Sequence, residues 1–245
     1  MKLILMILSS ILLLCLFLYP RYNLERLTTE ENIQDVHNKL KLKHGDFNDE
    51  LPEQKMILKH ITGESKVIEF GPNIGRSSLI INYKLKDKTQ HLCIESSKDS
   101  CDKLTENRDL NNMKFQIFNG AISNIPLYQQ AWKVSPIYNE GSHKVNVDSL
   151  NNILEIYNIK FNTIVADCEG CIVSILKENE HILKQIKLII LEHDFNSKQD
   201  LILYNNLMKK YNFKLIDKTL KKTVGLENWK EGIKDDPIFV SVWSK

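Results

Sequence analysis

Short apolar runs alternate with helix-forming segments from Lys66 to Val242, and this alternation constrains the fold more than any other feature of the 245-residue sequence. The apolar runs predict seven β-strands, at residues 67–70, 91–95, 115–118, 163–166, 188–192, 213–216 and 238–242. Helices are expected between them, at residues 76–85, 97–110, 148–157, 170–177 and 198–211. Strands that alternate with helices form a parallel sheet that is covered on both faces. The sequence therefore predicts an α/β domain with a mostly parallel sheet.

The amino terminus has a different character. Leu3 to Tyr19 is a run of seventeen residues without a charge, close to the ~20 residues that span a bilayer. No small-x-small cleavage site ends the run, so we expect an uncleaved signal anchor over residues 1–20 rather than a cleaved signal peptide. This predicts a transmembrane helix before the domain and a single-pass membrane location. Lys2 and Arg21 flank the run almost evenly, which leaves the side of the membrane open.

The remaining chain divides into a connector and one large domain. Residues 21–63 are predicted to form a helical connector, because Pro52 suits a first helical position and Gly63 can end that helix. Residues 64–245 then form the main domain. The formal net charge is only +2, with acidic and basic residues interspersed, so we expect no nucleic-acid partner.

Polar residues follow five of the predicted strands at the point where each strand ends. In an open parallel sheet, ligands bind beyond these carboxyl ends, where the strand order reverses. The polar groups are Glu69 with Gly71, Asn73 and Gly75; Glu95; Asn119 with Ala121; Asp167 with Glu169; and His193 with its acidic neighbours Glu192 and Asp194. We expect these groups to meet in one ligand site.

The first two groups favour a nucleoside ligand. Gly71 and Gly75 allow the backbone to approach a ligand closely, and Glu95 can accept hydrogen bonds from both hydroxyls of a ribose. A dinucleotide would need a Gly-x-Gly-x-x-Gly turn, but Pro72 and Asn73 interrupt that spacing. S-adenosylmethionine, which carries a ribose and no phosphate, fits better.

Four segments together resemble a known family. They are EFGPNIG at residues 69–75, Glu95 followed by KLTEN at 103–107, NGAIS at 119–123, and DCEG at 167–170 before an apolar helix. This ordered set looks like the FkbM family of class I methyltransferases, over about residues 66–195. The resemblance implies a Rossmann-like methyltransferase fold with a seven-stranded sheet, S-adenosylmethionine as donor, and a hydroxyl acceptor on a sugar, a glycan or another small molecule.

The resemblance also carries over by position. It assigns donor binding to the turn and to the next two strand ends, that is to Glu69, Gly71, Asn73, Gly75, Glu95, Asn119 and Ala121. It matches Asp167, Glu169 and Gly170 to the motif after the fourth strand. Val165 and Ile172 stand where family members often have a lysine and an acid, which bears on the choice of acceptor.

Methyl transfer needs a base for the proton of the acceptor hydroxyl. Asp167 and His193 are the predicted candidates, with Glu169 orienting the substrate. We predict no metal site. Cys168 and Cys171 could form a redox pair at a helix amino terminus, but they fill variable apolar positions of the Asp-x-Glu-Gly motif and are predicted to be reduced packing residues.

Two alternatives stay open beside the methyltransferase. The first is a catalytically inactive Rossmann-like module that binds a nucleoside or a sugar, suggested by Val165 and Ile172. The second is a thiol-redox protein that uses Cys168 and Cys171. Binding of S-adenosylhomocysteine separates the methyltransferase and the inactive module from the redox protein.

Overall fold

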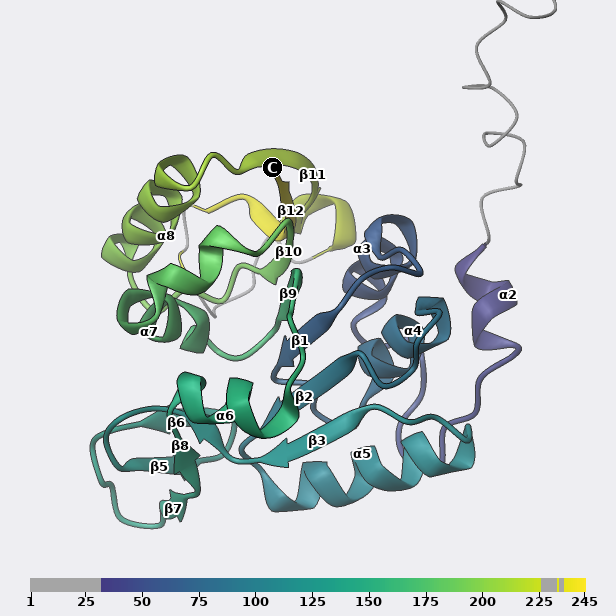
Figure 1. Ribbon diagram of the computed structural model, residues 1–245, viewed down its shortest axis with the longest axis horizontal. Helices are drawn as coiled ribbons and strands as arrows, with labels where there is room; N and C mark the ends of the chain where they lie inside the picture. Colours follow the sequence, from purple (N-terminus) through teal and green to yellow (C-terminus); the bar gives the residue numbers. More distant parts are fainter. Residues whose placement is uncertain (1–31, 226–232, 234–235) are drawn as a thin grey trace, which may run out of the picture. The chain divides into compact units, whose positions relative to one another are not determined.

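A seven-stranded sheet forms the centre of the computed structural model, which describes residues 32–225, 233 and 236–245 (Figure 1). Its strands are β1 (Val67–Phe70), β2 (His91–Glu95), β3 (Gln116–Asn119), β9 (Thr163–Ala166), β10 (Leu188–Glu192), β11 (Lys214–Leu220) and β12 (Ile238–Ser244). The order across the sheet is β3-β2-β1-β9-β10-β12-β11. All neighbours are parallel except β12, which runs antiparallel to both β10 and β11.

The direction of strand addition reverses between β1 and β9. The chain builds outward from β1 through β2 to β3, and then returns to place β9 on the other side of β1. Such a reversal opens a crevice beyond the carboxyl ends of the two central strands. The structure confirms the mostly parallel, seven-stranded sheet that the sequence predicts.

Helices cover both faces of the sheet. One face carries α2 (Ile33–His37), α3 (Leu51–His60), α4 (Arg76–Lys84) and α5 (Lys98–Leu110), and the other carries α6 (Leu150–Tyr157), α7 (Cys171–Glu178) and α8 (Lys198–Lys210). Alternate residues of each strand serve the two faces, because side chains of a strand point in alternate directions. In β1, Val67 packs with the α3–α4 face, whereas Ile68 and Phe70 pack with the α6–α7 face. This pattern explains why most residues of the central strands are apolar.

The segment before β1 contributes to the first of these two cores. Val36, Met56, Ile57 and Ile61 are buried together with residues of α4 and the sheet. The part of the predicted 21–63 connector that the structure describes therefore packs on the domain. The predicted boundaries at residues 20 and 63 stay predictions.

A small β-structure between β3 and α6 has no counterpart in the sequence prediction. β4 (Ala121–Ile122) pairs with β8 (Val147–Asp148), and β5 (Leu127–Gln130) pairs with β6 (Lys133–Ser135) and β7 (His143–Val145). These strands have two to four residues each, too few for a clear alternation of apolar and polar positions. Two short 3-10 helices, η3 (Glu180–Lys184) and η4 (Lys221–Val224), complete the elements that the structure describes.

The expected transmembrane helix requires a correction. In the described part of the chain, no helix is long and apolar enough to cross a membrane. The longest helices of the described residues, α5 and α8, have 13 residues and therefore span roughly 20 Å of a ~30 Å hydrocarbon core. Residues 3–19, on which the expectation rested, lie outside the described residues. The fold class is thus corrected to an α/β domain in whose described residues no helix spans a membrane, and the predicted single-pass membrane location is not supported.

Candidate active site

A cleft of about 770 Å³ opens at the carboxyl ends of the central strands. Its wall is formed by the segments that follow β1, β2, β3, β9 and β10, by the residues before α3, and by the β5–β6 hairpin. This is the position at which an open parallel sheet places its ligand. The cleft brings together Gly71, Asn73, Glu95, Ala121, Asp167, Glu169 and His193 among the residues predicted from the sequence.

Gly71 holds the turn after β1 against the segment after β9. Its φ angle is +77°, and a Cβ built on it would lie 1.8 Å from the carbonyl oxygen of Asp167. The backbone N–H of Asp167 in turn donates to the carbonyl of Phe70 at 3.0 Å. No side chain fits at position 71, so the glycine is required for the two central strand ends to meet at the cleft.

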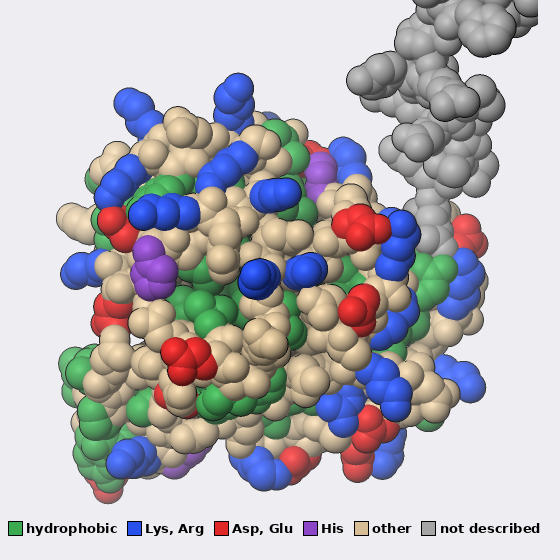
Figure 2. Space-filling model, in the orientation of Figure 1, with side chains coloured by type: hydrophobic (Ala, Val, Ile, Leu, Met, Phe, Trp, Pro, Cys, Tyr) green, Lys and Arg blue, Asp and Glu red, His purple; other side chains and the backbone are tan. Residues whose placement is uncertain are grey.

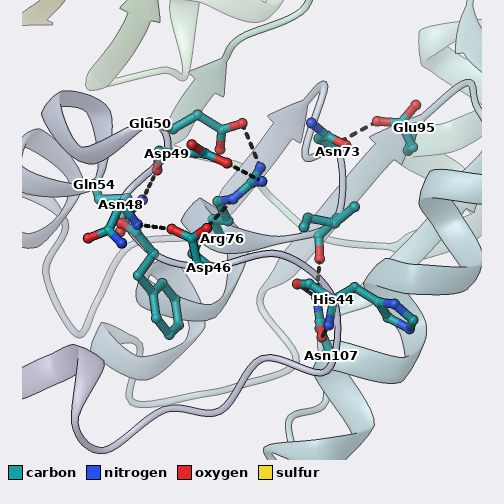
Figure 3. Close-up of polar contacts among 12 residues, drawn as sticks. His44, Asp46, Asn48, Asp49, Glu50, Gln54, Asn73, Arg76, Glu95 and Asn107 are labelled. Atoms are coloured by element: carbon teal, nitrogen blue, oxygen red, sulfur yellow. Dashed lines mark hydrogen bonds and ion pairs between the residues drawn. The ribbon is translucent and has the colours of Figure 1, made fainter.

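Glu95 presents an oriented carboxylate at the end of β2. Its two oxygens accept backbone N–H groups from Asn73 at 3.0 Å and from Ser97 at 2.8 Å, and Figure 3 shows the first of these contacts. Asn73 adopts a φ of +52°, which turns its N–H toward the carboxylate. Burial raises the pKa of Glu95, while the backbone donors oppose this rise. The carboxylate is thereby fixed with its remaining lone pairs free for a ligand hydroxyl.

Three predicted residues lie behind the cleft wall. Glu69 is buried under the glycine turn on the α4 side of β1. Gly75, with φ +95°, begins α4 against Leu104 of α5. The side chain of Asn119 donates to the carbonyl of Glu95 at 3.0 Å and so supports the end of β2. These three residues shape the wall without lining it.

Glu69 belongs to a buried group that could be mistaken for a metal site. Its Oε2 atom lies 2.7 Å from Ser78 Oγ, 2.9 Å from His91 Nε2 and 3.2 Å from Cys93 Sγ. Among the described residues, Glu69, His91 and Cys93 are the group whose ligand atoms lie close enough to hold an ion. A histidine that binds metal normally donates its other ring nitrogen to an acceptor, but the Nδ1 atom of His91 has no partner. We interpret the group as a hydrogen-bond network that supports β1.

Asp167, after β9, and Glu192, at the end of β10, share a side-chain hydrogen bond in the cleft. Burial, followed by the neighbouring Glu192, raises the pKa of Asp167. Burial also raises the pKa of Glu192 to about 8, and the pKa of Asp194 to about 6. Two acids this close cannot both ionise easily, so the pair retains a proton at neutral pH. The sequence analysis named Glu192 and Asp194 as neighbours of His193 but gave them no role.

His193 is placed differently from its predicted role. Its Nδ1 atom lies 2.7 Å from Asp236 Oδ2, and its Nε2 atom lies 2.8 Å from Ser241 Oγ. The imidazole is buried, with about 4% of the residue exposed. With both ring nitrogens occupied, the histidine ties β10 to β12 and the segment before it, and has no nitrogen left for a substrate proton.

Arg76 holds the segment before α3, part of which lines the cleft. Its guanidinium donates to Asp49 Oδ2 at 2.8 Å, to Glu50 Oε1 at 3.0 Å and to the carbonyl of Asp46 at 2.8 Å (Figure 3). Sequence reasoning missed these partners because they lie in the predicted connector. One signal was available in the sequence. The helix dipole disfavours a cation in the first turn, so Arg76 at the start of the predicted helix indicated an acidic partner from another segment.

Cys168 and Cys171 are joined by a disulfide, with an S–S distance of 2.10 Å. The prediction that they are reduced packing residues is therefore wrong, although both also pack partly against the apolar core. In the described chain, the free cysteines are Cys93 and Cys101, both buried. Glu169, inside the bridged turn, lines the cleft with a φ of +55°.

The β5–β6 hairpin gives the cleft an apolar rim. Trp132, Val134 and Pro136 line it, and Trp132 is 64% exposed. Ile137 and Tyr138, which follow β6, are exposed as well. Figure 2 shows the resulting apolar surface at the lower left, over β5–β7. An acceptor would thus meet apolar surface at the rim and carboxylates inside.

No family model and no curated protein matches the sequence. The chain is similar in structure to an O-methyltransferase from Bacillus cereus in complex with SAH, with a TM-score of 0.47, 15% identity, and coverage of 92% of this chain and 96% of that one. It is also similar to a ribosomal protein L11 methylase from Lactobacillus delbrueckii subsp. bulgaricus, with a TM-score of 0.47, 12% identity, and coverage of 83% and 81%. An rRNA methylase from Streptococcus thermophilus gives a TM-score of 0.45 and 10% identity over 78% and 93%. At these scores the structural neighbours, which include methyltransferases, describe a shared type of fold and carry no argument about this chain's chemistry.

Proposed function

We propose that the chain is an S-adenosylmethionine-dependent methyltransferase whose donor binds in the cleft between β1 and β9. The observation that carries this proposal is the convergence of an oriented acid, Glu95, and a side-chain-free turn, Gly71, on the Asp167–Glu192 pair. Glu95 would hold the ribose hydroxyls, Gly71 and Asn73 the amino-acid part of the donor, and Ala121 the adenine edge. When bound, this donor supplies a methyl group that is already activated as a sulfonium.

The protein then has to position the acceptor and manage one proton. Holding two reactants in line can contribute on the order of 7 to 11 kcal/mol to lowering the barrier. Asp167 is the proposed base, and Glu192 its proton-sharing neighbour. A sulfonium nearby favours ionised carboxylates, so donor binding would lower the pKa of the pair and prepare it to accept the hydroxyl proton. Such a base contributes ~10² to 10⁴-fold.

His193 takes a positioning role in this proposal. Its two hydrogen bonds, to Asp236 and Ser241, fix the end of β10, from which Glu192 and Asp194 reach the cleft. Glu169, on the bridged turn, is proposed to orient the acceptor. Glu69, Gly75 and Asn119 support the donor-binding segments from behind.

The proposed acceptor is a hydroxyl on a sugar, a glycan or another small molecule, as the FkbM-like motifs imply. The base pair supports oxygen as the acceptor atom, because a hydroxyl must lose its proton during transfer. The apolar rim at Trp132 supports an acceptor with an apolar face, such as a sugar ring that can stack on an indole.

The runner-up is an inactive module that binds the nucleoside without transferring a methyl group. Val165 and Ile172 are both fully buried in the two apolar cores, so neither position can supply the lysine or acid that related sequences often have. If those two groups were needed for transfer, the cleft would bind the donor only.

Two measurements test the proposal. Titration calorimetry with S-adenosylhomocysteine should show binding that Glu95→Ala abolishes, and absence of binding to the folded wild type would overturn both readings. Transfer of labelled methyl from the donor to a panel of glycans and hydroxylated small molecules should then yield a labelled ether. Binding without product, over the panel and over extracts of the source cells, would favour the inactive module.

A further inference from the structure

The Cys168–Cys171 disulfide lies in the wall of the candidate active site. Both cysteines line the cleft and both are partly exposed. The bridge begins directly after Asp167, and Cys171 is the first residue of α7. A small thiol that enters the cleft therefore reaches the bridge and the proposed base together.

The disulfide encloses an unusual backbone conformation. Glu169 and Gly170 have φ angles of +55° and +81° in succession. Residues with a side chain rarely adopt this left-handed region, so Glu169 is held there by its surroundings. The N–H of Gly170 donates to Asp194 Oδ2 at 2.8 Å, and the N–H of Cys171 to the carbonyl of Cys168 at 3.1 Å. The bridge adds a covalent restraint across this turn.

Reduction of the disulfide removes that restraint and increases the distance between the two sulfur atoms. Two sulfur atoms that are no longer bonded must separate to van der Waals contact, at about 3.5 to 4 Å. The turn between them has only two residues, Glu169 and Gly170, so loss of the cross-link gives these residues and the neighbouring Asp167 more freedom to move. The shape of the cleft thus depends on the state of the two cysteines.

We propose that Cys168 and Cys171 form a thiol–disulfide exchange site inside the cleft, and that the disulfide form holds Asp167 and Glu169 in the arrangement that binds the donor. The second part rests on the proposed function. In the exchange, a thiolate of a small thiol or dithiol attacks one sulfur and forms a mixed disulfide, and the other cysteine leaves as a thiolate that takes a proton. A second thiol of the reductant then releases the first cysteine, so two electrons and two protons pass to the protein and the reductant becomes a disulfide.

The other two cysteines among the described residues provide an internal control. Cys93 and Cys101 are 0% and 4% exposed, and burial raises the pKa of Cys101 to about 12. Thiolate is the reactive form, so neither should exchange or react in the folded protein. Labelling of the folded, full-length chain with iodoacetamide is therefore read peptide by peptide, so that the pair in the cleft is separated from Cys15, which lies outside the described residues.

The first test measures the exchange itself and does not involve the donor. Protein oxidised with glutathione disulfide, and protein reduced with dithiothreitol, are each labelled and digested for mass spectrometry. We expect no label on Cys168 and Cys171 in the first sample, label on both in the second, and none on Cys93 in either. Hydrogen exchange of the amides at 168–171 should be faster in the reduced sample. Equal labelling of the pair in both samples would overturn the exchange site.

The second test measures the consequence for the donor. Titration with S-adenosylhomocysteine should give a Kd weaker by on the order of fivefold or more in the reduced protein, because the turn must be reordered on binding. A Cys168→Ser, Cys171→Ser double variant should bind like the reduced protein and should not respond to dithiothreitol. Equal Kd values for the two redox forms would overturn the second part of the proposal. If neither redox form binds S-adenosylhomocysteine, the proposed function and the second part of this proposal both fail. The labelling result still decides whether the exchange site exists.

Discussion

The carbonyl oxygen of Asp167 lies 1.8 Å from the point that a Cβ on Gly71 would occupy. The two residues belong to the ends of β1 and β9, the strands between which the sheet order reverses. The contact therefore places the glycine turn and the proposed base on opposite sides of one narrow point in the cleft. Neither segment can move without the other.

Gly71→Ala should disrupt both segments at once. The side chain has no space, and the φ of +77° alone costs a non-glycine residue of order 1 to 3 kcal/mol. Because the clash adds to this cost, we expect the free energy of unfolding to fall by at least that amount, and S-adenosylhomocysteine affinity to fall roughly 10- to 100-fold, since a displacement near 1 Å can have effects of this size. Gly141→Ala is the matched control, because it has a φ of +84° but only one atom, at 3.8 Å, near its Cβ position. If both variants bind the ligand equally well, the turn does not form the donor site.

Glu95→Gln should weaken donor binding while leaving the fold intact. The amide still accepts one backbone N–H, but it loses the charge that strengthens hydrogen bonds from ribose hydroxyls, each worth about 1.5 to 3 kcal/mol. We expect a 10- to 100-fold weaker Kd by calorimetry and an unchanged far-ultraviolet circular dichroism spectrum. Glu64→Gln, at a side chain 78% exposed, serves as the control and should leave the Kd unchanged. An unaltered Kd in Glu95→Gln would remove Glu95 from the donor site.

The sequence predicted the central strands well because their burial on both faces leaves a continuous apolar signal. β1, β2, β9 and β10 have the predicted bounds. The ends of these strands also indicated most of the cleft, since topology alone brings the residues after parallel strands to one edge. Pattern reasoning could not say which way a strand-end side chain points, and so it could not tell that Glu69 lies behind the cleft wall or that both ring nitrogens of His193 are hydrogen-bonded.

What the sequence did not reveal depends on contacts between distant segments. Arg76 finds Asp49 and Glu50 about 26 residues earlier in the chain, through the packing of α3 on α4. The Asp167–Glu192 pair likewise forms only when β9 and β10 become neighbours. The Cys-x-x-Cys motif of Cys168 and Cys171 is visible in the sequence, but this spacing alone does not distinguish a disulfide from two packed thiols.

The Asp167–Glu192 pair predicts a pH dependence of stability. The folded pKa of Glu192 is raised from 4.5 to about 8, so the folded state binds more protons than the unfolded state between these values. The free energy of unfolding should therefore fall as pH rises from about 5 to 8, by at most about 1.4 kcal/mol per pH unit from this group. Thermal unfolding at several pH values measures it. Glu192→Gln should flatten the decline, and an identical slope in the variant would contradict the assignment.

Asp167→Asn should separate transfer from binding. The amide keeps the volume and can still hydrogen-bond Glu192, but it cannot take the acceptor proton. Once an acceptor is identified, we expect kcat to fall by ~10² to 10⁴-fold with the Kd for S-adenosylhomocysteine within about threefold of wild type. His193→Asn is the comparison, and because that residue positions β10 it should mainly lower the melting temperature. A kcat near the wild-type value in Asp167→Asn would exclude Asp167 as the base.

Arg76 should matter for stability because it holds the segment before α3. The Arg76 side chain is 10% exposed and pairs with the Glu50 side chain, which is 24% exposed. Arg76→Ala therefore leaves the Glu50 carboxylate in a partly buried site without its cation. Burial already raises the pKa of Glu50, and Arg76 opposes that rise, so the variant should hold Glu50 protonated to higher pH. We expect the free energy of unfolding to drop by about 1 to 3 kcal/mol in urea titrations, below the 3 to 5 kcal/mol of a fully buried pair because solvent screens part of this one. Lys86→Ala breaks an ion pair to Glu64 whose partners are both more than three-quarters exposed, and should leave the free energy of unfolding close to the wild-type value. Equal effects of the two substitutions would mean that the Arg76 contacts to the segment before α3 contribute no more than a surface pair.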